Sequence, residues 1–82
     1  MEYDELWGIS YKRLREYFSS LPGAEPRGKG VFSLGGGEVR LTGQPDAHFG
    51  SLCIPRTRVE LRGPRAEELH RALTLRFLSA GG

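Results

Sequence analysis

The sequence predicts an α+β fold, with a helix near each end of the chain and an antiparallel sheet of about four strands between them, stacked as a two-layer sandwich. Apolar residues recur every three or four positions near both ends, and they alternate with polar residues in the middle. Glycines and prolines separate these segments. With 82 residues, 38% of them hydrophobic, the chain forms one domain over residues 1–82.

The first helical pattern spans residues 3–21. Its apolar stripe consists of Tyr3, Leu6, Trp7, Tyr11, Leu14, Phe18 and Leu21. Ser10 suits the N-cap of a helix that runs to Leu21, and Pro22-Gly23 ends that helix. Because Gly8 is costly inside a helix, we expect residues 3–7 to form a separate turn or short helix.

The middle of the chain predicts the strands. Residues 22–30 read as a connection, and Val31–Leu34 and Glu38–Thr42 form a hairpin around three glycines.

Residues 43–48 read as a loop. A mostly apolar strand, Phe49–Ile54, is closed by Pro55, and Arg56–Arg62 alternates again.

The last helix is expected over Pro64–Ser79, with Glu67 and Glu68 complementing its positive N-terminal end. In the expected core, the sheet residues are Val31, Val39, Leu41, Leu52, Ile54, Val59 and Leu61. The helical core residues are Trp7, Leu14, Phe18, Leu69, Leu73 and Phe77.

The face of the sheet that points away from the helices carries arginines. Alternation places Arg40, Arg56, Arg58 and Arg62 there, together with two glutamates. Arginine forks suit phosphates and carboxylates, so this face is a candidate site for nucleic acid or another anion. The alternative is a solvated face of Glu–Arg pairs, which the lack of stacking aromatics favours.

Few residues suggest catalysis. Asp46, His48 and Cys53 form a formal nucleophile trio, but a lone cysteine in a strand is typically a packing residue. His70 reads as an ordinary, partly exposed imidazole. Two histidines and one cysteine predict no metal site, and no motif predicts a cofactor. A backbone nest near Lys29 is the remaining anion site that the glycines suggest.

Charge and composition limit the partners and the cellular location that we expect. The formal charge of +2 is too small to indicate a nucleic-acid partner by itself. The single cysteine, and the lack of a leader-like or membrane-spanning pattern, predict a cytoplasmic protein without a membrane contact. Few amides and many arginines predict thermostability, and a GC-rich genome is the alternative cause of the same arginine and glycine bias.

Aromatic residues are unusually frequent near the N-terminus. There are more of them than one helix stripe in a small core hides: Tyr3, Trp7, Tyr11, Tyr17 and Phe18. We therefore expect Tyr3, Trp7 and Tyr17 to form an association surface. A homodimer is predicted, through the first helix or through the edge strand that Pro55 closes; another protein is an alternative partner.

Two family resemblances follow from the layout and the last residues. In length and in its final Gly81-Gly82, the chain resembles the sulfur carriers of molybdopterin and thiamin synthesis, whose terminal glycine is adenylated and then carries a thiocarboxylate. In size and element layout, it resembles the small unassigned C-terminal domain of proteins related to the molybdopterin synthase small subunit (MoaD). That second resemblance implies no known activity.

Three functions therefore stand as predictions. The favoured one is a non-enzymatic, self-associating module. The alternatives are a nucleic-acid or anion-binding module that uses the arginine face, and a sulfur-carrier-like protein that acts through Gly81 and Gly82.

Overall fold

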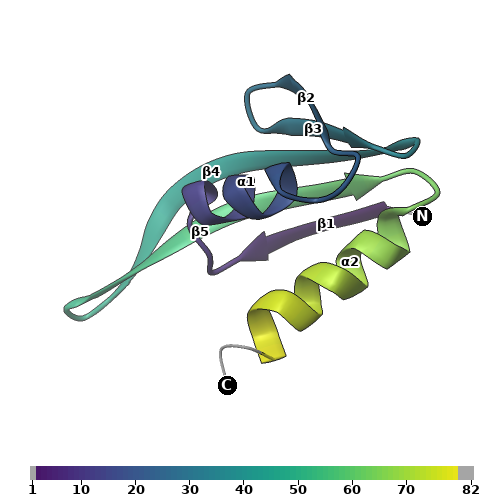
Figure 1. Cartoon of the computed structure of the whole chain (residues 1–82). Helices are drawn as coiled ribbons and strands as arrows, with labels where there is room; N and C mark the ends of the chain where they lie inside the picture. The colour runs from purple at the N-terminus through teal and green to yellow at the C-terminus, as the bar shows by residue number, and fades with distance from the viewer. Residues whose placement is uncertain (1, 80–82) are drawn as a thin grey trace.

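The chain folds into a five-stranded antiparallel sheet with both helices on one face, a two-layer α+β arrangement (Figure 1). The computed structural model describes residues 2–79. Its elements are β1 (Glu2–Trp7), α1 (Tyr11–Ser19), β2 (Glu25–Gly28), β3 (Val31–Leu34), β4 (Gly37–Phe49), β5 (Leu52–Arg62), α2 (Ala66–Thr74) and a π-helical turn η1 (Leu75–Ser79). The strand order across the sheet is β1-β5-β4-β3-β2.

Residues 2–7 form strand β1, so the prediction of a turn or short helix over residues 3–7 is wrong. This segment pairs along its whole length with β5, from Glu2 opposite Arg62 to Trp7 opposite Thr57. The spacing of Tyr3 and Trp7 fits one helical turn, but it also fits every second residue of a strand. Pairing with the distant strand β5 decides between helix and strand for this segment, and the spacing of its apolar residues does not reveal that pairing.

The helix that follows is confirmed, with Ser10 as its N-cap. The Ser10 hydroxyl accepts a hydrogen bond from the backbone N–H of Arg13 at 3.2 Å. The helix ends at Ser19, slightly before the predicted end at Leu21. α1 then lies across β4 and β5.

The hairpin of β3 and β4 is confirmed, with a turn in which Gly35 and Gly36 take φ values of 51° and 88°. The segment before it is not only a connection, because β2 pairs with β3 at the sheet edge. All four residues of β2 are exposed, so it carries no apolar alternation to detect. Its register shifts between Pro26 and Gly28.

The second half of β4 corrects two predictions. Residues 43–48 are strand rather than loop, and the reversal falls at Gly50, whose φ is 61°, inside the predicted strand 49–54. β5 then continues through Pro55. Proline is tolerated here because the β4–β5 register shifts between Gln44 and Ala47, where the ladder of backbone hydrogen bonds is already interrupted.

The core lies between the sheet and the two helices. The buried apolar residues are Leu14, Phe18, Phe32, Leu34, Val39, Leu41, Val59, Leu61, Ala66, Leu69 and Leu73. Three residues expected there lie outside it. Val31 is on the opposite face of β3, and Leu52 and Ile54 share the exposed face of β5 with Arg56 and Arg58, away from the helices. In the described part of the chain, no helix has the length and apolar character needed to cross a membrane.

Candidate association surface and the outer sheet face

The outer sheet face, defined as the face opposite the helices, carries the predicted arginines. Arg40 and Arg58 are exposed on β4 and β5, and Arg56 and Arg62 lie at alternate positions of β5. Arg40 lies 3.7 Å from Glu38 on its own strand. The predicted orientation of these side chains is thus confirmed, because Val59 and Leu61, which alternate with them, are buried.

Strand β1 adds carboxylates to this face that the sequence did not place there. Arg58 contacts Asp4 at 2.6 Å, and Arg62 contacts Glu2 at 3.3 Å. Glu60, the most buried of these acids, lies 4.0 Å from Arg58 and 3.5 Å from Arg62. The hydrogen bond from Arg58 lowers the pKa of Asp4, and the same bond raises the pKa of the guanidinium.

Among the described residues, Arg56 is the one predicted arginine without an ion pair. The outer face is therefore a mixture of both charges and not a basic surface. A mixed face attracts polyanions weakly, because phosphates must compete with the carboxylates already in place. Binding of nucleic acid here stays a prediction.

The aromatic residues predicted to form an association surface are half-buried. Tyr3 and Trp7 face the helices from β1 and pack against the core. Tyr17 contacts Phe18 and Phe77 edge-on, with ring centroids 5.0 and 5.4 Å apart. Their role in association stays a prediction, and the large exposed apolar side chains lie elsewhere.

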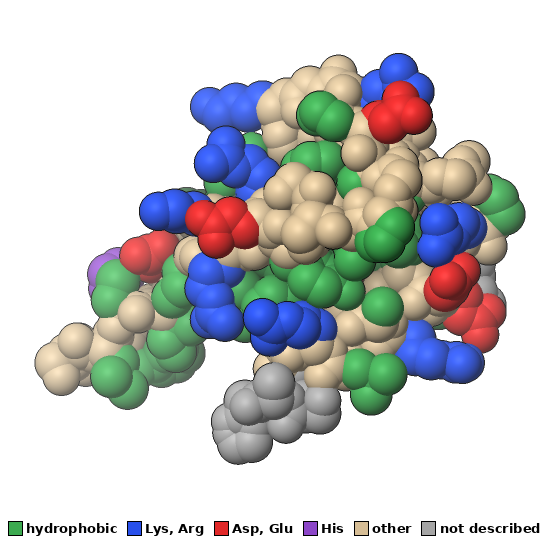
Figure 2. All heavy atoms as spheres, in the orientation of Figure 1, with side chains coloured by type: hydrophobic (Ala, Val, Ile, Leu, Met, Phe, Trp, Pro, Cys, Tyr) green, Lys and Arg blue, Asp and Glu red, His purple; other side chains and the backbone are tan. Residues whose placement is uncertain are grey.

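Three of those side chains, Phe49, Leu52 and Ile54, lie on the β4–β5 arm, which we define as residues 45–54. The arm is a two-stranded hairpin that projects beyond the helices and the other strands, at the lower left of Figure 1. Phe49 and Leu52 are each 64% exposed, and Ile54 is 36% exposed. Hydrophobic side chains also line this projection in Figure 2.

The arm has one apolar and one polar face. Ala47 pairs with Ile54 and Phe49 with Leu52, and directly paired residues of an antiparallel ladder point to the same face. Ile54 reaches Gly8, since a Cβ added to Gly8 would lie 3.7 Å from its Cγ2. Leu6, 53% exposed two residues earlier, extends the same surface. We call Leu6, Ala47, Phe49, Leu52 and Ile54 the apolar patch.

The polar face of the arm holds the predicted nucleophile trio. His48 and Cys53 are directly paired, and the Cys53 thiol donates a 3.0 Å hydrogen bond to Asp46. The structure thus brings the three residues together, but the bond and the charge of Asp46 raise the pKa of the thiol. A nucleophile needs the opposite shift, so this geometry does not activate Cys53.

A polar cluster that sequence reasoning missed joins α2 to β1. One oxygen of Glu5 accepts a hydrogen bond from the Trp7 indole at 3.3 Å and lies 2.7 Å from His70 Nε2. The Tyr3 ring stacks on the imidazole, with centroids 4.0 Å apart and planes 3° apart. No local signal connects residues 5 and 70, because they meet only when β1 joins the sheet.

The other predicted sites add little. Within residues 2–79, no group of three acidic, histidine or cysteine side chains is arranged to hold a metal ion. Lys29 lines an open hollow beside Tyr11 and Thr42. Gly81 and Gly82 lie outside the described residues.

Comparison with known proteins identifies a family. The model of a protein family described as archaeal MoaD-like protein matches residues 3–82 of the chain. No curated protein matches it. The family match confirms the resemblance to MoaD-related proteins that size, layout and the final glycines indicated.

Proposed function

We propose that this chain, which belongs to the archaeal MoaD-like protein family, is a non-enzymatic association module that pairs with a second copy of itself through the apolar patch. The observation that carries the proposal is the arm. Phe49, Leu52 and Ile54 share one face of a projecting hairpin and have no helix above them. Burying one such side chain contributes about 1.5–3 kcal/mol of favourable free energy, so a partner that covers this face gains binding free energy from each of them.

A second copy is the occupant that fits the surroundings of the patch. The outer face next to the arm carries arginines and carboxylates in alternation, so it offers neither an acidic nor a basic partner a uniform field. A two-fold contact places the same surface on both sides, so apolar residues meet apolar residues and each charge can meet its opposite. The patch and its mixed border are self-complementary in this sense.

The test is the oligomeric state across micromolar to millimolar concentrations, measured by sedimentation equilibrium. We expect a dimer that the double variant Phe49→Ser, Leu52→Ser weakens by at least about tenfold, the equivalent of about 1.4 kcal/mol. Leu75→Ser is the matched control, because Leu75 is 61% exposed but lies in η1, away from the arm. It should leave the dimer unchanged.

Two results would contradict the proposal. One is a chain that stays monomeric over the whole concentration range. The other is a dimer that survives the double variant but is lost in Tyr17→Ser, which would move the contact to the helix-side aromatics.

A sulfur-carrier function is the second candidate, and the family match together with the final Gly81-Gly82 favours it. In that function the terminal carboxylate attacks ATP, which releases pyrophosphate and leaves an acyl-adenylate. A protein persulfide then displaces AMP, and a thiol cleaves the resulting acyl disulfide to leave a thiocarboxylate. The fold itself differs from that of the carriers at its start, since a strand and a helix replace their opening hairpin.

Mass spectrometry distinguishes the two candidates. The chain ending in Gly82 is incubated with ATP, a persulfide donor, a thiol and an activating enzyme of molybdopterin synthesis. A carrier gains the mass of one sulfur in place of one oxygen, and the chain shortened by Gly82 does not. An unmodified full chain counts against the carrier function and leaves the association proposal untouched.

A further inference from the structure

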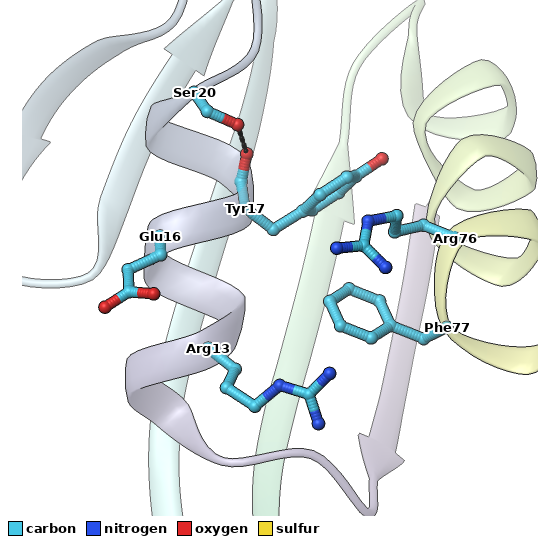
Figure 3. Close-up of a pocket in the computed structure, with 6 residues that line it drawn as sticks. All are labelled: Arg13, Glu16, Tyr17, Ser20, Arg76 and Phe77. Carbon is cyan, nitrogen blue, oxygen red and sulfur yellow. Dashed lines mark hydrogen bonds between the residues drawn. The ribbon is translucent and has the colours of Figure 1, made fainter. Parts of the chain in front are cut away.

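A cleft lies on the helix side of the molecule, between α1 and η1, away from the apolar patch. Its volume is about 240 Å³. The residues that line it are Arg13, Glu16, Tyr17, Ser20, Arg76 and Phe77 (Figure 3). None of them belongs to the sites predicted as anion-binding from the sequence.

Two guanidinium groups converge in this cleft on one aromatic ring. The Cζ atom of Arg13 lies 5.4 Å from the centroid of Phe77, and that of Arg76 lies 5.3 Å from it. Figure 3 shows both forks reaching toward the ring from the two facing elements. Cation–π contact of this kind orients the forks but leaves their N–H donors available.

The two arginines lack counterions within the described part of the chain. Neither forms an ion pair there, in contrast to Arg40, Arg58 and Arg62 on the outer face. Glu16 lines the cleft, but its carboxylate points away from both guanidiniums in Figure 3. Burial raises the pKa of Tyr17, so its hydroxyl stays neutral and adds no negative charge.

From this geometry we propose that the cleft between Arg13 and Arg76 is a binding site for a phosphate monoester, with the rings of Phe77 and Tyr17 against its organic part. A phosphate monoester carries about 1.5–2 negative charges at pH 7, which matches two unpaired arginines. It also offers three terminal oxygens to two forks. A carboxylate carries one negative charge and two oxygens, so it matches the charge and the donors of two forks less well than a phosphate monoester does.

Titration with phenyl phosphate, followed by NMR of the arginine Nε–Hε groups, tests the site. We expect saturable shifts of Arg13 and Arg76, and at least about tenfold weaker binding in Arg13→Gln and in Arg76→Gln. Arg15→Gln is the matched control, because Arg15 is an exposed arginine of the same helix that does not line this cleft. It should change the affinity less than about twofold.

The site is also tested by ligand and by variant. Benzoate has the same ring with a carboxylate and should bind at least about tenfold more weakly. Phe77→Leu keeps both arginines but removes the ring that gathers them, so it should weaken phenyl phosphate binding as well. All the variants should melt as cooperatively as the parent chain.

Three outcomes would overturn the proposal. They are shifts spread evenly over the exposed arginines, an Arg15→Gln effect equal to that of Arg13→Gln, and benzoate binding as tight as that of phenyl phosphate. Each of these would show an unspecific attraction between charges or a carboxylate site. None of them bears on the dimer, whose patch lies on the arm.

Discussion

Arg58 holds the carboxylate of Asp4 with two parallel hydrogen bonds across strands β5 and β1. Its Nε donates to Oδ1 at 2.8 Å and its Nη2 to Oδ2 at 2.6 Å. The two-pronged geometry fixes both planes, so the pair fastens the edge strand as well as neutralising a charge. The attachment of strand β1 to the sheet therefore depends in part on the charge of Asp4. Nothing in the sequence near Asp4 indicates that its partner is Arg58.

Because of this pair, the stability of the fold should decrease as the solution becomes acidic. The hydrogen bond from Arg58 lowers the pKa of Asp4 in the folded state. A lowered folded pKa means that the stabilisation is complete above the unfolded value, about 3.9, and is lost as the pH falls through the folded value. Asp4→Asn should lower the melting temperature at neutral pH, and the difference from the parent chain should vanish in strong acid.

Calorimetry from neutral to strongly acidic pH checks this prediction. Glu25→Gln is the control, because the ion pair of Glu25 with Arg27, at 3.3 Å, lies on the exposed strand β2 and not between two strands. A deficit of Asp4→Asn that persists unchanged in strong acid would show that its cause is not the ion pair.

Thr57 is the one buried polar residue among the described residues, and its hydroxyl donates to the Ile9 carbonyl at 2.7 Å. Thr57→Val keeps the shape but leaves that carbonyl without its donor, at a cost of about 1–3 kcal/mol. Urea unfolding measures the loss. Thr42→Val, on the exposed face of β4, should stay within about 0.5 kcal/mol of the parent chain. Equal effects of the two substitutions would refute the role of the Ile9 bond.

Gly63 joins β5 to α2 with a φ of 98°. A Cβ there would lie 2.8 Å from the Cα of Gly37 and 3.0 Å from the carbonyl oxygen of Gly36. Gly63→Ala should therefore cost about 1–2 kcal/mol for the backbone conformation, with a further cost of about 1–3 kcal/mol for crowding. Denaturant titration should show this loss, while Gly43→Ala, which meets nothing within 4 Å, stays near the parent value.

Cys53 should react slowly with iodoacetamide although it is exposed. Its bond to Asp46 raises the pKa of the thiol, and the thiolate is the form that reacts. Asp46→Asn removes the negative charge and should accelerate alkylation at mildly alkaline pH. Ser51→Ala, in the adjacent turn, is the control for loosening of the arm. A rate that Asp46→Asn does not change would disprove the coupling.

The sequence predicted elements whose cause is local. The Ser10 cap, the Gly35-Gly36 turn and the alternation of Val59 and Leu61 with arginines each depend on neighbouring residues, and the structure confirms them. The predictions for Tyr3–Trp7 and for residues 43–48 are wrong. Both segments are strands because β5 pairs with each of them, and pairing between distant segments leaves little trace in either one.

The candidate sites also divide into features with a local cause, which the sequence predicts, and features that depend on contacts between distant segments, which it does not. The positions of Arg58 and Arg62 on the outer face came from alternation, but their carboxylate partners come from β1. The cleft that holds Arg13 and Arg76 was not predictable, because 62 residues separate the two in the printed sequence. The apolar residues Phe49, Leu52 and Ile54 are evident in the sequence, but the prediction of one strand over 49–54 is wrong because the chain reverses at Gly50. Their exposure depends on how far the hairpin extends past the helices.

Strand β2 also affects the tendency of the protein to aggregate at high concentration. It is short and fully exposed, contains Pro26, and shifts register before Gly28. An outermost strand with these properties is a poor template for another chain, because proline lacks a donor and the irregular register breaks the row of free backbone groups. The β2 edge of the sheet therefore disfavours the edge-to-edge addition of further chains that builds fibrils. Association through a closed dimer does not use this edge.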